Sequence, residues 1–311
     1  MSIRNIIKNR FVFYGFILLI ICGTVLPSIQ FLRKDVVAAP IKGGSVKVIS
    51  VSTTDGNQNR KNLFARGDLI EYNVDVYSTI SSSPSIDIRF EVVATNYNKF
   101  VASYLYNYDT TVHIDEIPLG SSSFHTSAKI PSHAAPATYA IRITATPSGR
   151  AFSASSGWNS FTVQPPSQLG PFETGTISLD GGSVQGTAQL ALFQNGGYNF
   201  NGCLHNSNPN IFPYEDSFVW GVASASGVVY QFPHSGQSSG TWAFWSSQDD
   251  CWNTTGTSSA IAGDWIALTE EVDHWDANVN IDIGLIIQDV FQALATIVPI
   301  IRTVVEEIIL E

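Results

Sequence analysis

The sequence predicts an all-β protein, in which one β-sandwich is followed by a second small β-sandwich or barrel. Three observations carry this prediction. The chain has 311 residues, a length that suits two domains with separate cores. Several short segments alternate apolar and polar residues, which is the period of a half-buried strand. Turn-forming residues separate these segments, and only 14% of the residues are charged.

The composition argues against nucleic-acid binding. The formal net charge is −10, and no basic patch is present to displace counterions from phosphate. An acidic surface keeps an extracellular protein soluble, which is the simpler interpretation of this charge. We expect no metal and no cofactor, because two thiols and scattered histidines such as His113, His125 and His133 do not make a ligand set.

The N-terminal residues 1–39 are predicted to be a signal peptide or a signal anchor. Basic residues precede an apolar run at 11–32, which is typical of an export signal. Small residues at 37–39 offer a cleavage site, although Pro40 would follow the cut. The apolar run is also long enough to stay in the membrane as an anchor. We therefore expect an extracytoplasmic protein that is either secreted or anchored, and both alternatives remain open.

The first sandwich is predicted at residues 44–164. The segments 45–51, 69–77, 86–93 and 137–145 alternate apolar and polar side chains. Alternation of period two places one face of each strand inside and the other outside, so these strands should form sheets that pack together.

Two short sequences in this domain resemble the immunoglobulin-like modules of bacterial surface proteins. Arg66-Gly67-Asp68 looks like the start of their second strand, and 135–143, with Tyr139, looks like a late strand. The resemblance implies a sandwich that spaces or assists another domain, although the paired cysteines of antibody domains are absent. We interpret Gly67 and Asp68 as turn chemistry rather than as part of an integrin-binding tripeptide, which would need an exposed loop tip.

A proline-rich linker is predicted at residues 165–171, because proline restricts φ and lacks an amide donor. The second β-domain should then span 172–280, with tight turns at Asn195-Gly196 and Ser226-Gly227. Its candidate strands are 175–179, 187–193, 197–203, 217–223, 228–232, 240–245 and 260–268.

Cys203 and Cys251 are predicted to form a disulfide, as expected for two cysteines in an exported chain. The chain-entropy model assigns such a closed loop on the order of 4 kcal/mol. Two free buried thiols are the alternative.

A tryptophan-rich stretch in the same domain is the predicted ligand site. Flat aromatic faces beside amide and carboxylate groups suit a sugar, because its C–H face stacks while its hydroxyls form hydrogen bonds. The alternative is that these rings fill the core. The candidate binding residues are Trp242, Trp245, Gln248, Asp249, Asp250, Trp252 and Asn253.

No catalytic residue is assigned, because no recognised catalytic motif is present. Adjacent carboxylates such as Glu215 and Asp216 would point to opposite faces of a strand. The function we expect is that of an exported, non-catalytic surface binding or adhesion protein for an extracellular glycan or protein. A structural, self-assembling envelope protein and a secreted polysaccharide hydrolase are the alternatives.

The C-terminal residues 281–311 are predicted to form an amphipathic helix that Pro299 kinks or interrupts. Its apolar face should dock on the β-domain, or join two copies of the chain through residues 283–310. Its polar face carries glutamates and a single arginine, which disfavours binding to an anionic membrane surface.

Overall fold

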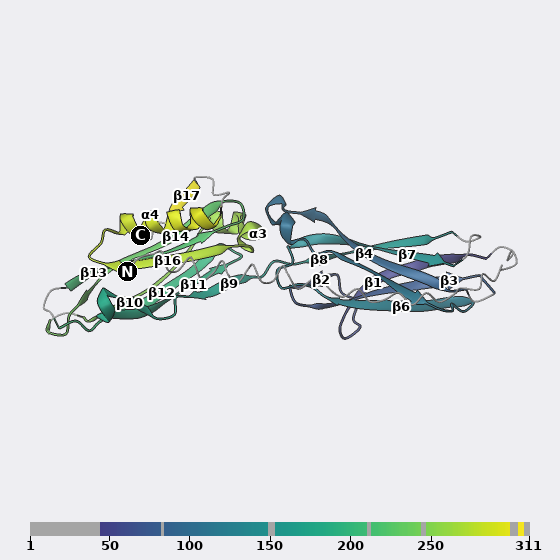
Figure 1. Cartoon of the computed structure of the whole chain (residues 1–311), viewed down its shortest axis with the longest axis horizontal. Coiled ribbons are helices and arrows are strands. Elements are labelled where there is room, and N and C mark those ends of the chain that lie inside the picture. The colour runs from purple at the N-terminus through teal and green to yellow at the C-terminus, as the bar shows by residue number, and fades with distance from the viewer. Residues whose placement is uncertain are drawn as a thin grey trace, which may run out of the picture. The chain divides into compact units, whose positions relative to one another are not determined.

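The computed structural model describes residues 44–81, 84–148, 153–209, 213–243, 247–298 and 304–307, the last range by its backbone alone. The predicted all-β architecture is confirmed: the strands form several mostly antiparallel sheets stacked in pairs, and within the described residues none of the sheets closes into a barrel (Figure 1). The proposed signal or anchor segment, residues 1–39, lies outside the described residues. Among the residues that are described, no helix is both long and apolar enough to cross a membrane.

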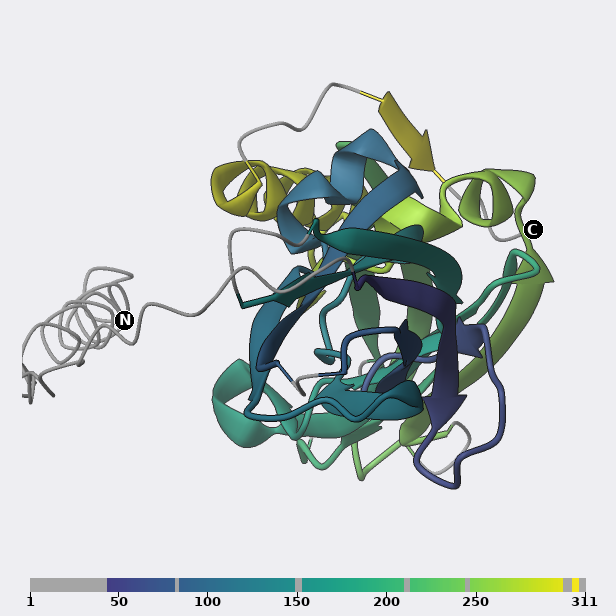
Figure 2. The ribbon, with the colours of Figure 1, turned by 90° about the vertical axis from the view of Figure 1, so that its right-hand side faces the viewer.

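The first sandwich packs a three-stranded sheet on a five-stranded sheet, as the view along its strands in Figure 2 shows. Its alternating segments explain this arrangement, because every second side chain of a strand such as β3 is buried. The first sheet contains β1 (Val46–Asp55), β3 (Leu69–Ser78) and β6 (Gly120–Lys129). The second contains, in order, β2 (Leu63–Phe64), β8 (Ser155–Val163), β7 (Ala137–Pro147), β4 (Ile86–Tyr97) and β5 (Tyr108–Ile114), and η3 (Lys99–Tyr104) connects β4 to β5.

Tyr139 lies in the centre of this first core. Its ring stacks on Phe161 at 5.4 Å, and its hydroxyl donates to the Ala135 carbonyl at 2.8 Å. The same hydroxyl accepts from the Tyr106 amide at 3.2 Å. Burial raises the pKa of Tyr139, so the phenol stays neutral. Its bond with Tyr106 joins β7 to the segment before β5, and its bond with Ala135 holds the residues just before β7.

The second sandwich contains a five-stranded and a four-stranded sheet (Figure 1). The first has the order β10 (Ile177–Leu179), β11 (Val184–Phe193), β12 (Gly197–Asn206), β15 (Asp249–Thr257), and β9 (Gln168–Glu173) also pairs with β11. The second has the order β16 (Val272–Val279), β13 (Pro213–Ala223), β14 (Val228–Ser239), β17 (Val304–Glu307). The short helices η4 (Asp180–Gly182), α2 (Ser259–Gly263) and α3 (Trp265–Leu268) lie between strands.

Three local predictions in this part of the chain were wrong. In the expected strand 240–245, residues 240–243 form a turn, which the Ala243 amide closes by donating to the Gly240 carbonyl at 3.0 Å, and residues 244–245 lie outside the described residues. Residues 260–268 form α2 and α3 instead of a strand, because their buried residues Ile261, Trp265 and Leu268 recur at helical spacing. Strand β9 also extends into the expected linker, residues 165–171. Proline is compatible with β9 because, among the described strands, β9 pairs with β11 alone and lies at the sheet edge.

The Asn195-Gly196 turn is confirmed as the hairpin between β11 and β12. Gly196 has a φ of 88° and donates to the Phe193 carbonyl at 2.9 Å. A side chain at Gly196 would also lie 2.3 Å from the Ser258 carbonyl oxygen, so glycine is required for both conformation and space. This turn fixes the register of β11 against β12.

Helix α4 (Ile283–Ile297) follows β16 and covers the outer face of β13 and β16. Its apolar stripe, Ile286, Val290 and Leu294, is buried there, as the docking interpretation predicted. The helix is shorter than expected and ends before Pro299, because Val298 takes the extended backbone that a residue before proline prefers. The chain then forms β17, which pairs with β14 in parallel.

Candidate functional site

The outer face of β11, β12 and β15 is covered by uncharged polar side chains. The register brings Gln189, Asn201 and Asn253 into one row across the three strands, and Asn199 beside Thr255 in the next row. Their neighbours along each strand point inward and are mostly buried. We call this surface the amide face; it consists of Gln185, Thr187, Gln189, Asn199, Asn201, Asn253 and Thr255.

An open hollow of about 860 Å³ lies at one end of the amide face. Asn199 and Thr255 belong both to the amide face and to the wall of the hollow, and Phe193 adds an aromatic ring. The remaining lining residues come from the β11–β12 turn and from the chain around the start of β9: Ser167, Gln168, Gln194, Asn195, Gly197, Tyr198 and Gly256. The hollow therefore combines amide and hydroxyl groups with an apolar surface, and none of its lining residues is charged.

The few charged groups near the amide face are already paired. The carboxylate of Glu173 accepts from the Gln189 side-chain amide at 3.0 Å. At the far end, His205 Nδ1 lies 2.7 Å from the Asp249 carboxylate. The amide groups between them each offer donors and acceptors, so the face is suited to a ligand with many hydroxyl groups and no net charge.

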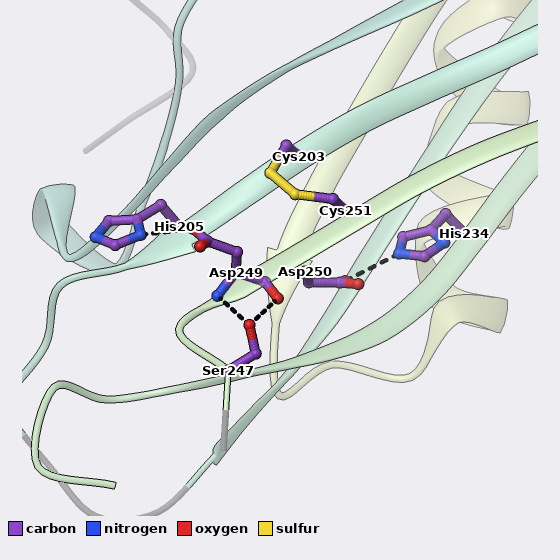
Figure 3. Close-up of a disulfide and its surroundings, with 7 residues drawn as sticks. All are labelled: Cys203, His205, His234, Ser247, Asp249, Asp250 and Cys251. Carbon is purple, nitrogen blue, oxygen red and sulfur yellow. Dashed lines mark hydrogen bonds and ion pairs between the residues drawn. A yellow bond between two sulfur atoms is a disulfide. The ribbon is translucent and has the colours of Figure 1, made fainter. Parts of the chain in front are cut away.

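The predicted disulfide is confirmed, and it crosses the amide face (Figure 3). Cys203 and Cys251 occupy directly opposite positions on β12 and β15, one row away from Asn201 and Asn253. Cys251 is exposed and Cys203 is half-buried. A disulfide of this kind is typical of an oxidising, extracytoplasmic compartment.

The predicted binding residues are divided between the two faces of the sheet. Asp249 and Asn253 point outward, whereas Asp250 and Trp252 point inward. Trp252 is 8% exposed and packs against Phe200 and Phe218, at centroid distances of 5.6 and 5.8 Å. Its ring therefore fills the core, which was the alternative to sugar stacking.

The remaining members of the predicted set lie around the turn after β14. Trp242 is exposed there, and Gln248 is half-buried and accepts from the Asn206 amide through its backbone carbonyl at 2.9 Å. Trp245 lies outside the described residues. Of the original set, Asp249, Asn253 and Trp242 are the described side chains that a ligand can reach most readily.

A cluster of ionisable side chains lies between the two sheets of the second sandwich. Asp250 from β15 contacts His234 from β14, with 2.9 Å between Oδ2 and Nε2 (Figure 3). The imidazole also stacks on Trp252, with ring centroids 4.0 Å apart. Gly236 makes this possible, because a Cβ there would lie 2.0 Å from Asp250 Oδ2. Sequence reasoning missed the cluster, since only the pairing of distant strands brings it together.

Asp216 on β13 completes this cluster and is the most deeply buried of its carboxyl groups. It is paired in register with Gly236, is 1% exposed, and neither carboxylate oxygen has a hydrogen-bond partner among the described residues. Burial raises the pKa of Asp216, and the negative charge of Asp250 raises it further. The nearby Ser238 and His234 oppose this shift of the pKa.

Two carboxyl groups in such different environments resemble an acid–base pair. In this conformation a substrate cannot reach these groups, because the side chains of Asp250 and His234 are only 11% and 15% exposed and Asp216 is enclosed. The cluster joins the two sheets internally and offers no surface to a polymeric substrate.

Arg66, the first residue of the Arg-Gly-Asp sequence, is held by internal contacts. Its Nε donates to the Ala134 carbonyl at 2.8 Å and its Nη1 to the Thr269 carbonyl at 3.1 Å, and Nη2 pairs with Glu270. Gly67 has a φ of 83°, and Asp68 accepts from the Ala65 amide. The tripeptide is therefore used in a turn and an ion pair, as the turn interpretation predicted.

No protein-family model matches the chain, and neither does any curated protein. Solved structures with a similar fold include a cycloisomaltooligosaccharide glucanotransferase from Paenibacillus sp., at 18% identity and a TM-score of 0.26. The match covers 39% of this chain and 14% of that one, so the chain spans a small part of the enzyme's length.

Two other similar structures are the CARDB domain of a Pyrococcus furiosus protein and a family 123 glycoside hydrolase from Clostridium perfringens. The first has 12% identity and a TM-score of 0.25, over 39% of this chain and 94% of that domain. The second has 14% identity and a TM-score of 0.23, over 39% of this chain and 27% of the enzyme. The immunoglobulin-like assignment of residues 44–164 stays a prediction.

Proposed function

We propose that this chain is an exported binding protein whose second sandwich binds a neutral glycan on the amide face. The observation that carries the proposal is the composition of the hollow. Asn199, Thr255 and Gln194 supply donors and acceptors for sugar hydroxyls, while Phe193 offers an apolar surface for a C–H face. A glycan longer than one sugar would continue from the hollow along the row of Gln189, Asn201 and Asn253.

The rigidity of this surface supports binding. Its side chains come from paired strands, and the β11–β12 register is fixed by the hairpin at Gly196. A site built on regular strands loses little conformational entropy when it is occupied. The disulfide supports the extracytoplasmic location, where polysaccharides are available as ligands.

The full-length protein tests this proposal on a glycan array, with affinities then measured by calorimetry. We expect saturable binding to an uncharged glycan, lost or strongly weakened in Asn199→Ala and Thr255→Ala. Gln237→Ala is the matched control, because Gln237 is an exposed glutamine on β14 in the other sheet. Trp242→Ala tests the tryptophan-based prediction separately. Absence of binding to any neutral glycan, with the protein folded, would overturn the proposal.

A self-assembling structural protein is the second candidate. The observation that favours it is the exposure of two apolar residues on α4, Leu285 and Ile297, each 55% exposed. These side chains remain free after the buried stripe of α4 has docked on β13 and β16. Light scattering of the wild type and of Leu285→Glu tests this: a monomeric wild type excludes the candidate, and an oligomer that the substitution dissociates supports it.

A further inference from the structure

Trp158 is an exposed aromatic residue on the outer face of the first sandwich, which the sequence did not mark as a site. It is 61% exposed, the largest exposed fraction of any Trp, Tyr or Phe side chain among the described residues. On the inner side of β8, its neighbour Gly157 packs against β1, where a Cβ would lie 2.5 Å from Val48 and 2.8 Å from Val51. The alternation of β8 therefore holds Trp158 outward.

The residues around Trp158 are small and mostly hydroxylated. Ser156 and Ser160 flank it on the same face of β8 and are exposed. Across the strand pair, Thr144 and Ala140 occupy the corresponding positions on β7, which lies beside β8 in Figure 1. None of these side chains is long enough to cover the indole, so the ring face that Arg142 leaves uncovered is open to a flat ligand.

Arg142 supplies a charge beside this ring. It lies directly opposite Trp158 in the register, and its guanidinium lies over the indole at 5.4 Å from the ring centroid. Its other cross-strand neighbour, Glu91, contacts Arg89 at 3.7 Å instead. Within the described residues, Arg142 makes no hydrogen bond and no ion pair, so its N–H donors are free to bind an anion.

We propose that Trp158 and Arg142 form a binding site for an acidic sugar, a uronic acid residue of an extracellular polysaccharide. The sugar ring stacks on the indole face that Arg142 leaves uncovered, its carboxylate pairs with the guanidinium at the edge of the indole, and the hydroxyls of Ser156 and Ser160 contact the sugar hydroxyls. The site goes beyond the proposed function, because it lies on the other sandwich and takes a charged ligand.

Calorimetry with the full chain tests the site, using tetragalacturonate as the probe and galactotetraose as its neutral counterpart. We expect tetragalacturonate to bind, and Arg142→Gln and Trp158→Ala each to weaken it by about tenfold or more. Binding should weaken as salt is raised, since the paired charges are exposed. Tyr77→Ala, an exposed aromatic residue on the opposite sheet, is the control and should bind as the wild type does.

A second measurement reports on the ring itself. Acrylamide should quench Trp158 less when tetragalacturonate is bound, and the Trp158→Phe variant should not show this protection. The proposal is overturned if tetragalacturonate does not bind, or if Arg142→Gln and Trp158→Ala both bind it unchanged. Equal affinity for galactotetraose would also overturn it. Binding abolished only by Asn199→Ala would place the ligand on the amide face and would reject the Trp158 site.

Discussion

Replacing Asp216 with asparagine is expected to stabilise the protein at neutral pH. The carboxyl group is enclosed between two sheets, its oxygens have no partners among the described residues, and burial raises its pKa. Leaving a buried polar group unpaired costs about 1–3 kcal/mol, and more when the group is charged. Asparagine keeps the shape and carries no charge, so we expect a gain of about 1 kcal/mol.

The pH dependence of this gain gives the sharper test. A carboxyl whose pKa is raised in the folded state favours folding below its unfolded pKa, near 3.9. That contribution is lost as the pH rises through the folded pKa, and asparagine has no such dependence. The difference in unfolding free energy between Asp216→Asn and the wild type should therefore be small at acidic pH and grow toward neutral pH.

Urea unfolding followed by tryptophan fluorescence measures this difference. The signal reports mainly on the second sandwich, because all tryptophans except Trp158 lie in residues 172–280. Glu215→Gln is the matched control, since Glu215 is an exposed carboxylate on the same strand, β13. If Asp216→Asn is less stable than the wild type at neutral pH, or if its effect does not change with pH, Asp216 is not an unpaired buried carboxyl.

Three further substitutions test the packing. Gly221→Ala should destabilise the protein by about 1–3 kcal/mol in urea unfolding, because a Cβ there would lie 2.5 Å from Val290 and 2.7 Å from Leu294; no loss would mean that α4 docks elsewhere. Arg66→Gln should cost about 3 kcal/mol by leaving Glu270 buried without its cation, an effect that Glu270→Gln in the same chain should partly restore. Replacing Cys203 and Cys251 with serine should lower the melting temperature, by an amount equivalent to about 2–4 kcal/mol for a loop of 48 residues; an unchanged melting temperature would show that the disulfide does not stabilise the fold.

The strands were predictable where one face meets a core and the other meets water. The alternation in 69–77 and the turn at Asn195-Gly196 are local signals, and the structure reproduces both. In contrast, the stretch 260–268 is short and apolar except around Gly263 and Asp264, so its period was ambiguous, and tertiary packing selects the helical form.

The candidate sites depend on pairings between strands that are distant in sequence. Trp252 has polar neighbours, which suggested an exposed ring, but the pairing of β15 with β12 turns it inward. Asp216 and Asp250 come from different sheets, and no local signal links them. For the amide face, the sequence shows alternating polar residues at 185–189 and 199–201. Only the register of the strands shows that those side chains share one surface with Asn253.

The position of the disulfide has a consequence for the edge of the second sandwich. Among the described strands, β15 pairs with β12 alone, so no second neighbouring strand keeps it from slipping along β12. A shift by one residue would turn Asn253 and Thr255 inward and expose Trp252. Because Cys203 and Cys251 are directly opposite partners, the covalent link allows only one alignment of the two strands. The disulfide thus fixes the register of β15 against β12, and it keeps Asn201 and Asn253 in one row even when the edge strand frays.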